Sequence, residues 1–363
     1  MTLIRTFHPI GQGAFYTERH NFNGTDFTIV YDCGSTTIKR EKLERKIKST
    51  FPKGHSIDIL FISHFHADHI NGIEVLANHC NIKKVVLPLI DDMSKILLKV
   101  ANLIEVNFSD TSLIDNPEDF FGGNTSIIRI APTEINLNTD GIGINDPRDI
   151  SRIEENGTYS SGTVFTPLVD IDWFFIPFNY EHDKRKIQFE NALRTYGLTL
   201  ADIDTINKIN KNKRNIIKAY NDIDGDLNEN SMVLFSGKKS KDDIQYLKGS
   251  HLYFHHSYYA DLQSGCLYLG DIDLNELNIV ADINVKLKQF LPFIGTLQIP
   301  HHGSIHNFAN SILQLQPYCA IFSYGTNNPY SHPSDMVIGD VILKNIYPFH
   351  VTEVSTSMVI QCK

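Results

Sequence analysis

Four side chains that can bind metal ions lie within six consecutive residues of the sequence: His64, His66, Asp68 and His69. Imidazole nitrogens and carboxylate oxygens are the ligands that borderline divalent metals such as zinc and manganese accept. The apolar residues 57–63 before them predict a buried strand. Burying these groups at the end of a strand without a metal would leave polar atoms unpaired, which is costly. The cluster therefore predicts a metal-dependent enzyme rather than ordinary core histidines.

The composition of the chain is that of an ordinary globular protein, with 42% hydrophobic and 21% charged residues. The net charge of −9 argues against a generally basic nucleic-acid-coating protein, but it permits a local basic channel. Five scattered cysteines without a Cys-x-x-Cys pair exclude a disulfide framework and favour a reducing cytoplasm. No apolar run approaches the ~20 residues that span a bilayer. We therefore expect a soluble, cytoplasmic protein without membrane insertion.

Short apolar strands alternate with helices in the first and the last third of the chain. In the first third we expect strands at 2–8, 13–19, 27–32, 57–63 and 83–88, and helices at 37–49 and 70–79. In the last third we expect strands near 231–236, 251–258, 265–270, 295–299, 318–323, 349–353 and 357–362, and helices near 275–290, 305–315 and 334–344. Helices outside two sheets that meet face to face would form a single α+β domain over residues 1–363, a four-layer αββα sandwich.

Residues 91–228 break this alternation and predict an insertion or lid within the domain. Residues 109–165 are rich in Asn, Asp, Gly, Ser and Thr, which is typical of long loops, and residues 170–178 return to strand character. Residues 184–220 are predicted to be helical and basic, with nine Lys or Arg against three acidic residues between 184 and 218. This charge indicates either a track for a phosphate backbone or a solvated helix face.

Further strand ends also carry residues that can bind metals. Asp271 follows one apolar strand, His301 and His302 follow the next, and His332 lies in a turn after a third. A single Gly-Asp is more often a turn, and adjacent histidines occur by chance. The same construction at several strand ends argues against coincidence, because open α/β sheets bring such ends together. We therefore expect these residues to meet the cluster at 64–69.

Eight short motifs follow one another along the chain between residues 11 and 333. They are Gly11-Gln12-Gly13, Asp32-Cys33-Gly34, the cluster from His64 to His69, Asn228-Glu229-Asn230-Ser231, Gly270-Asp271, Pro300-His301-His302-Gly303-Ser304, Ser323-Tyr324-Gly325-Thr326-Asn327-Asn328 and His332-Pro333. In this order they resemble the metallo-β-lactamase superfamily, and within it the hydrolase domain of the competence protein ComEC and its free-standing relatives. Those relatives commonly have Asp after Gly-Gln-Gly, where this chain has Ala14.

The resemblance implies two divalent metal ions, Zn²⁺ or alternatively Mn²⁺. His64 and His66 would bind one ion, and Asp68 with His69 would bind the other. The set would be completed by a bridging carboxylate, a further imidazole and a carboxylate that orients a ligand: Asp271, His302 (or His301) and Asp32.

The resemblance also implies attack of a metal-activated hydroxide on a phosphorus atom. Asp68 and His332 are the residues that we expect to take part in catalysis. His332 would hydrogen-bond a phosphate oxygen or protonate the leaving group, and the alternative is a turn histidine without a role.

Three functions remain open from the sequence. The first is a phosphodiesterase or nuclease acting on nucleotides or nucleic acid, including single strands. The second is a hydrolase for a small molecule, such as a phosphoesterase, with residues 109–165 as its lid. The third is a metal-stabilised module that is active only with a partner protein.

Overall fold

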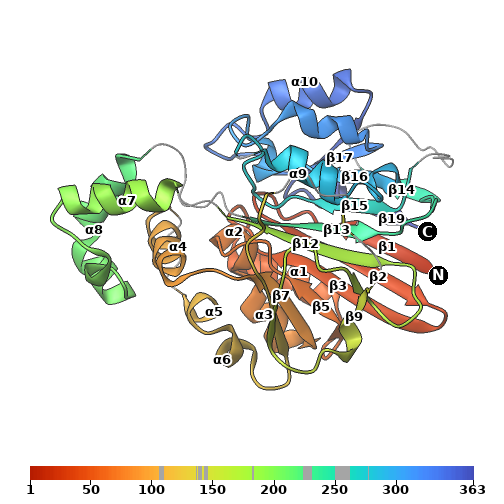
Figure 1. The fold of residues 1–363 in the computed structure, drawn as a ribbon, viewed down its shortest axis with the longest axis horizontal. Helices are drawn as coiled ribbons and strands as arrows, with labels where there is room; N and C mark the ends of the chain where they lie inside the picture. The colour runs from red at the N-terminus through yellow and green to blue at the C-terminus, as the bar shows by residue number, and fades with distance from the viewer. Residues whose placement is uncertain are drawn as a thin grey trace.

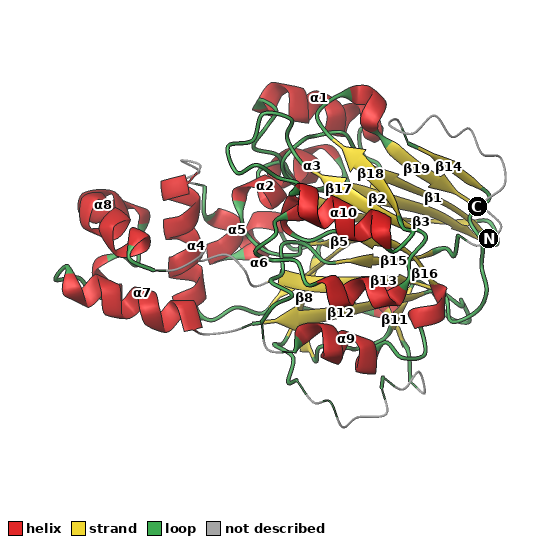
Figure 2. Ribbon diagram, turned by 90° about the horizontal axis from the view of Figure 1, so that it is seen from above, coloured by secondary structure: helices red, strands yellow, loops and turns green. Residues whose placement is uncertain are grey.

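The computed structural model describes residues 1–105, 110–135, 137, 141–142, 146–181, 184–223, 231–249, 262–276 and 278–363. Two large β-sheets pack face to face, and helices cover the outer face of each sheet (Figures 1 and 2). The structure therefore confirms the four-layer α+β sandwich predicted from the alternating strands and helices. Among the described helices, none is both long and apolar enough to cross a membrane.

The first sheet has nine strands within the described residues. They are β1 (Thr2–Phe7), β2 (Phe15–Phe22), β3 (Thr25–Cys33), β5 (Ile59–Phe61), β7 (Lys84–Pro88), β8 (Ser126–Ile130), β10 (Gly157–Tyr159), β14 (Tyr246–Lys248) and β19 (Val359–Cys362). Their spatial order is β10-β8-β7-β5-β3-β2-β1-β19-β14. Strands from β10 to β3 pair in parallel, and those from β3 to β14 pair antiparallel. Consequently β3 and β5 end at the same edge.

The second sheet has eight strands within the described residues. They are β9 (Arg148–Asp149), β11 (Phe165–Thr166), β12 (Phe174–Tyr180), β13 (Ser231–Gly237), β15 (Gly265–Tyr268), β16 (Ile294–Gln298), β17 (Cys319–Ser323) and β18 (Tyr347–Val351). Their order is β18-β17-β16-β15-β13-β12-β11-β9. The strands from β15 to β18 are parallel, so the chain leaves all of them at one edge.

The core between the sheets follows from the alternation of side chains along each strand. In β3, Ile29 and Tyr31 point into the space between the sheets, whereas Val30 faces the outer helices. In β5, Phe61 faces inward and Leu60 outward in the same way. The strands at the centre of the sheet therefore bury both faces, which explains why residues 29–31 and 59–61 are apolar throughout.

Helices cover both outer faces of the sandwich. The first sheet is covered by α1 (Arg40–Thr50), α2 (Ala67–Ile70), α3 (Ile73–His79), α5 (Ser112–Asp115) and α6 (Pro117–Phe121). The second sheet is covered by α9 (Ile279–Lys286) and α10 (Asp335–Leu343). Short 3₁₀ segments lie at Ile150–Arg152, Leu200–Asp202, Leu291–Phe293, His301–Gly303, Asn310–Leu315 and Ser355–Ser357.

Three helices form a separate module at one side of the sandwich (Figure 1). They are α4 (Asp92–Glu105), α7 (Lys184–Thr195) and α8 (Ile206–Asn221), and they are called the helical module below. Their apolar faces share a cluster distinct from the sheet cores: Leu97, Val100, Leu103, Phe189, Leu193, Leu198, Ile203, Ile209, Ile216, Ala219 and Ile223. The helix predicted over 184–220 is thus two helices that pack on each other.

Residues 91–228 are divided between this module and the two sheets. β8 pairs with β7 in the first sheet, and β12 pairs with β13 in the second. The segment therefore completes the sandwich as well as adding to it, and its role as a lid stays a prediction.

Two expected elements differ in the structure. The strand predicted over 57–63 is split at Asp58, so that β4 (Ser56–Ile57) pairs with β6 (Asn81–Ile82) in a separate two-stranded sheet. Asp58 interrupts the strand because its carboxylate accepts a hydrogen bond from the Thr28 backbone N–H at 2.7 Å. The helix predicted over 305–315 is only the 3₁₀ segment at Asn310–Leu315. The strand predicted near 251–258 lies outside the described residues.

Candidate metal centre

The predicted metal-binding residues meet at one edge of the sandwich. Parallel strands of each sheet end there, and the residues after β5, β15 and β16 supply the cluster at 64–69, Asp271 and His302 respectively. Because both sheets present their carboxyl ends to the same edge, residues more than two hundred positions apart become neighbours.

Four of these residues form a compact, buried group. Atoms of Asp68, His69, Asp271 and His302 that can bind a metal lie within 4.8 Å of one another. His69 Nε2 lies 3.2 Å from Asp271 Oδ1, and His302 Nε2 lies 3.0 Å from Asp68 Oδ2. Two carboxylates and two imidazoles at this spacing are a donor set suited to a divalent ion.

The other two histidines of the cluster lie directly beside this group. His64 Nε2 lies 3.8 Å from Asp271 Oδ2, and the His64 and His69 rings are 4.1 Å apart. His66 Nδ1 lies 2.9 Å from Asp68 Oδ1. Asp271 thus has His64 near one carboxylate oxygen and His69 near the other, which is the geometry of a carboxylate between two binding positions.

Unpaired atoms in this group test whether a metal fits. Within the described structure, His64 Nε2, His69 Nε2 and Asp271 Oδ1 are buried and make no hydrogen bond. A buried polar atom without a partner costs about 1–3 kcal/mol. Both imidazole nitrogens lie within 4 Å of an Asp271 carboxylate oxygen, so divalent cations bound beside Asp271 would satisfy these atoms. The residues present therefore fit a divalent metal site.

Hydrogen bonds on the far side of two imidazoles orient their Nε2 atoms. Asp32 Oδ2 accepts from His69 Nδ1 at 2.8 Å and from Ser63 Oγ at 2.6 Å. Because Ser63 gives its only proton to Asp32, it accepts from His64 Nδ1 at 2.9 Å. Each ring carries its proton away from the cluster, and each Nε2 lone pair faces into it.

His302 is held in the same way by a backbone group. Its Nδ1 donates to the carbonyl oxygen of Ser323 at 2.8 Å, and Ser323 is the last residue of β17. His301 is only partly buried, and its ring centre is 5.7 Å from that of His332. The structure therefore brings His302 into the cluster and places His301 beside it, and His302 as the ligand stays a prediction.

The electrostatics of the cluster favour charged carboxylates and a neutral His64. Burial is the largest influence on Asp68 and opposes its ionisation, but His69, His66 and His302 together hold the pKa of Asp68 well below its ordinary value. Burial is also the largest influence on Asp271, and His69, His302 and His301 together hold the pKa of Asp271 well below its ordinary value. Burial, followed by repulsion from His69, holds the pKa of His64 well below its ordinary value. Two negative charges and a free imidazole lone pair suit a divalent cation.

Glycines and an asparagine fix the backbone of the metal-binding loop. A Cβ atom on Gly13 would lie 2.2 Å from the Asp68 carbonyl oxygen, and one on Gly34 would lie 2.6 Å from it. The predicted turn at Gly11-Gln12-Gly13 therefore does lie near the cluster. On the other side, buried Asn102 of α4 accepts from Ala67 N at 2.7 Å and donates to Phe65 O at 2.8 Å.

Sequence reasoning missed Asn102 and Ser63 as parts of the site. No motif marks Asn102, which belongs to the helical module; Ser63 had one signal, its place directly before His64. Ser231 does lie at the site, since its Oγ accepts from Asp271 N at 3.3 Å. The other residues of that motif, 228–230, lie outside the described residues.

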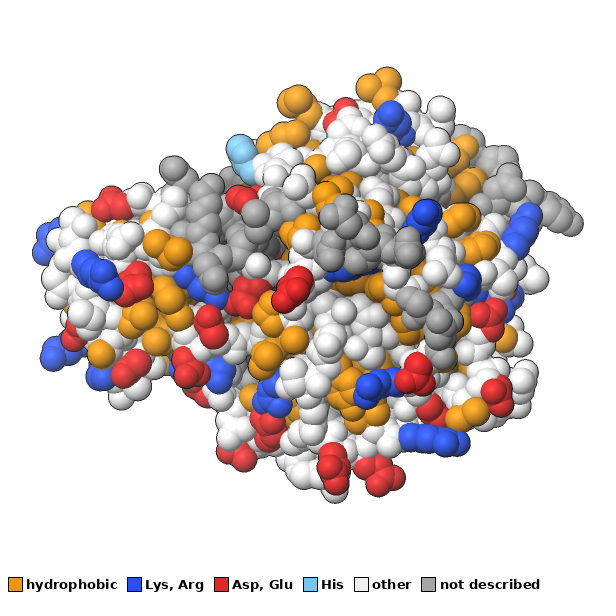
Figure 3. All heavy atoms as spheres, in the orientation of Figure 1, with side chains coloured by type: hydrophobic (Ala, Val, Ile, Leu, Met, Phe, Trp, Pro, Cys, Tyr) orange, Lys and Arg blue, Asp and Glu red, His pale blue; other side chains and the backbone are white. Residues whose placement is uncertain are grey.

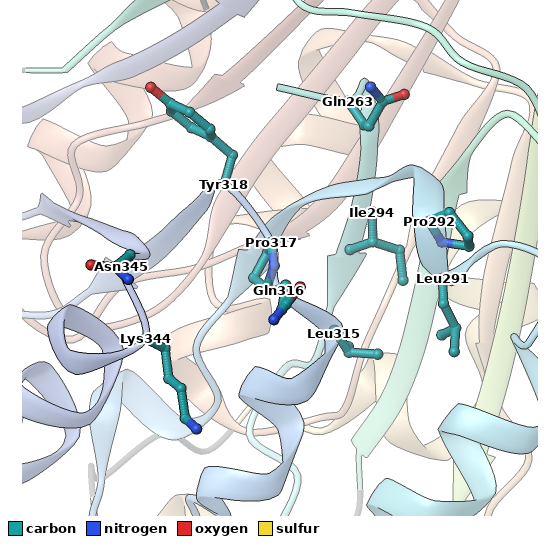
Figure 4. Close-up of a pocket in the computed structure, with 10 residues that line it drawn as sticks. All are labelled: Gln263, Leu291, Pro292, Ile294, Leu315, Gln316, Pro317, Tyr318, Lys344 and Asn345. Carbon is teal, nitrogen blue, oxygen red and sulfur yellow. The ribbon is translucent and has the colours of Figure 1, made fainter. Parts of the chain in front are cut away.

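A pocket separate from the candidate metal centre lies at the opposite edge of the sandwich, and Figure 4 shows the residues that line it. It has a volume of about 410 Å³ and is lined by residues that precede the parallel strands, including Gln263, Tyr318 and Lys344. Its described lining contains no His, Cys, Asp or Glu. The chemistry therefore belongs to the carboxyl edge.

A match to a protein-family model agrees with this fold. Residues 22–125 match the family model described as metallo-beta-lactamase superfamily. No curated protein matches the chain. Among solved structures, a mutant of the CmlA beta-hydroxylase has 10% identity and a TM-score of 0.44, covering 99% of this chain and 54% of its own, so the present chain spans about half of its length. Human tRNase Z, short form (ELAC1), has 10% identity and a TM-score of 0.35, covering 99% and 98%. The αββα sandwich is a metallo-β-lactamase fold, and the match over residues 22–125 supports placement in that superfamily.

Proposed function

We propose that this protein is a dinuclear metal-dependent hydrolase that cleaves phosphodiesters in nucleic acid or nucleotides. The observation that carries the proposal is the convergence of four side chains on Asp271, with three buried atoms left unpaired in the described structure; the four are His64, Asp68, His69 and His302. The family-model match supports metal-dependent hydrolysis.

The proposed binding residues form two groups around Asp271. His64 and His66 would hold one ion, Asp68, His69 and His302 would hold the other, and Asp271 would contact both. Two bound ions of this kind supply an activated water and neutralise charge that develops on a phosphate. Asp32 and Ser63 keep the His69 and His64 lone pairs directed into the cluster.

His332 is proposed to contact the substrate. Burial, followed by repulsion from His301, lowers the pKa of His332 to about 4, so its imidazole is neutral near pH 7. A neutral imidazole donates a hydrogen bond to a phosphate oxygen, which favours the first of the two roles expected for it.

The helical module supports a phosphate-rich substrate. Lys211, Arg214 and Lys218 follow one another at three- and four-residue spacing on α8, so they share one face of the helix. None of the three forms an ion pair with another described residue. Acidic side chains are interspersed elsewhere on the visible face of the module (Figure 3). Cations without acidic partners attract a phosphate backbone.

The proposal is tested by offering the purified protein several substrates with Zn²⁺ or Mn²⁺. The set is bis-p-nitrophenyl phosphate, a labelled single-stranded oligonucleotide and a β-lactam. Turnover of the diester and the oligonucleotide, absent in Asp271→Asn, is the expected result. Turnover of only the small diester would favour a small-molecule phosphoesterase. Failure of the fully metallated protein on every substrate would contradict the proposal and favour a module that needs a partner.

A matched control separates loss of the site from loss of the fold. Asp273 is also a buried carboxylate and lies two residues from Asp271, but it belongs to no metal-binding group in the described structure. Asp273→Asn is therefore expected to retain metal and activity.

A further inference from the structure

A cleft distinct from the pocket of Figure 4 lies beside the loop at 64–69. Two sequence motifs without an assigned role, at 11–13 and 323–328, meet there. Its volume is about 470 Å³, and it is lined by residues from four segments. Gln12 comes from the turn at 11–13, Thr37 and Lys39 from the segment before α1, Asn327 and Tyr330 from the loop after β17, and Glu353 from the segment after β18. The cleft is therefore built by the tertiary structure and not by one local turn.

The two motifs close on a single side chain, Thr37. A Cβ atom on Gly11 would lie 2.6 Å from Thr37 Cβ, and one on Gly325 would lie 2.3 Å from Thr37 Oγ1. Thr37 Oγ1 also accepts a hydrogen bond from Gln12 N at 2.8 Å. Both glycines are thus required for the close approach, and the walls of the cleft are held in place.

Gln12 is a buried amide whose side-chain oxygen lacks a partner among the described residues. It is 7% exposed, it lines the cleft, and within the described residues its Oε1 makes no hydrogen bond. An amide group carries both a donor and an acceptor, and its two ends are interchanged by rotation. Leaving such a group unpaired is costly. Gln12 therefore points to a polar ligand in the cleft.

The charge of the lining favours an anion. Lys39 and Lys42 both line the cleft, and neither forms an ion pair with a described residue. The Lys39 side chain does not cap the first turn of α1, whose Lys42 N and Leu43 N donate to the Lys39 carbonyl oxygen at 2.9 and 3.0 Å. Glu353 is the one acidic residue of the described lining, and it accepts hydrogen bonds from Thr326 N and Thr326 Oγ1.

Aromatic and imidazole rings connect the cleft to the metal centre. The Tyr330 ring, which is 58% exposed, stacks on His332 with ring centres 5.9 Å apart. His332 lies 5.7 Å from His301, and His301 lies 5.9 Å from His302. An exposed ring stacked in this position offers a face to a nucleobase.

We propose that this cleft binds the neighbouring nucleotide of a nucleic-acid strand, with its phosphate at Lys39, Lys42 and Gln12 and its base on Tyr330. The inference rests on the proposed function and extends it, because it requires a substrate with a second phosphate beyond the one that reacts. A small diester with a single phosphate reaches the metal centre without filling the cleft.

The test compares two substrates and two double variants. The substrates are oligothymidylate and bis-p-nitrophenyl phosphate, and the pocket variant is Lys39→Ala with Lys42→Ala. For this variant the ratio of kcat/KM for oligothymidylate to kcat/KM for the small diester is expected to fall about tenfold or more. The control is Lys46→Ala with Lys48→Ala, which removes the same charge from α1 outside the cleft and should leave the ratio within about twofold.

A third variant and a binding measurement complete the experiment. Gln12→Ala is expected to lower the same ratio, since it removes the unpaired amide. An unchanged ratio in both pocket variants, or an equal fall in the control variant, would overturn the proposal. If the wild type hydrolysed neither substrate, the proposed function would fail, and the cleft would still be decided by binding of fluorescein-labelled oligothymidylate in the presence of a chelator. Binding weakened by the pocket variant alone would support the cleft, and equal binding would contradict it.

Discussion

Glu18 and Asp271 are both buried carboxylates, but they differ in the hydrogen-bond donors that surround them. Glu18 of β2 lies between the sheets, and donors surround both of its oxygens. Its Oε1 accepts from Arg5 Nε and from Tyr268 Oη, both at 2.7 Å. Its Oε2 accepts from His20 Nε2 at 2.9 Å and from Ser236 Oγ at 2.8 Å. The chain itself therefore neutralises this charge.

Asp271 has no such set of donors. Its nearest side-chain neighbours are the Nε2 atoms of His69, His302 and His64, at 3.2, 3.6 and 3.8 Å. His69 and His64 donate their ring protons elsewhere. Without an ion, the imidazoles around Asp271 balance its charge by taking up protons: Asp271 and Asp68 raise the pKa of His69 well above its ordinary value, although burial opposes this. A bound cation would replace those protons. The comparison teaches that Glu18 has fixed donors within the fold, whereas the surroundings of Asp271 also fit a divalent cation.

Asp271→Asn is the most direct test of whether Asp271 is needed for metal binding and activity. We expect hydrolytic activity to fall by more than the ~10–100-fold typical of residues that only support a ligand. Metal content measured by atomic spectrometry should fall well below two ions per chain. An active variant with its full metal content would show that Asp271 does not lie between two ions.

Arg5→Met tests the other carboxylate. Removing the cation leaves Glu18 buried with an uncompensated charge, so the free energy of unfolding should fall by about 3–5 kcal/mol in urea denaturation. Metal content of the folded fraction should not change, because Arg5 contacts no metal-binding residue. Arg45→Met, at an exposed position on α1, is the control and should change stability by less than about 0.5 kcal/mol. The denaturation of both variants is also measured with a chelator present. If Arg5→Met then lost no more stability than the control Arg45→Met, the role given to Glu18 would be contradicted.

Asp32→Asn should have a smaller effect on the metal centre. The amide still accepts from His69 Nδ1 but loses the charge that strengthens this hydrogen bond. We expect metal affinity, measured by competition with a chromophoric chelator, to fall about 10–100-fold. Added metal should then restore the activity of Asp32→Asn. A metal affinity equal to that of the wild type would argue against a role for Asp32 in orienting His69.

Asn102→Ala is expected to affect the metal centre less than Asp271→Asn or Asp32→Asn. It leaves the Ala67 N–H and the Phe65 carbonyl without their partner, at a cost of about 1–3 kcal/mol each in the free energy of unfolding. Because the loop between them carries His66, KM for the diester and metal affinity should change by only a few-fold. Asn191→Ala, on exposed helix α7, is the control. An effect as large as that of Asp271→Asn would mean that Asn102 contacts the substrate.

The candidate metal-binding residues could be predicted from the sequence because four of them lie within six consecutive residues and the others follow apolar strands. The Glu18 network was not accessible in this way. Residues 2–8 and 13–19 were correctly predicted as strands, but Arg5 and Glu18 resemble the outward-facing charges of an ordinary alternating strand. Only the packing of the second sheet against β1 and β2 buries them, since Tyr268 and Ser236 come from β15 and β13.

The cleft beside the metal centre shows the same limit. Gly11-Gln12-Gly13 and Ser323-Tyr324-Gly325-Thr326-Asn327-Asn328 are recognisable as motifs, but nothing in either predicts that both close on Thr37. The pairing at Asn102 was hidden for a similar reason, because it joins the helical module to the metal-binding loop. Contacts of this kind depend on how distant elements pack, and no local pattern encodes them.

The sequence by itself determined the chemistry at each strand end and the layered fold, because apolar periodicity and contiguous imidazoles are local properties of the chain. The tertiary structure alone decided which carboxylate is neutralised internally, which histidine of the pair at 301–302 enters the cluster, and where a second cleft opens. The physical reason is that charge compensation and cavity shape depend on neighbours in space, which come from both sheets at once.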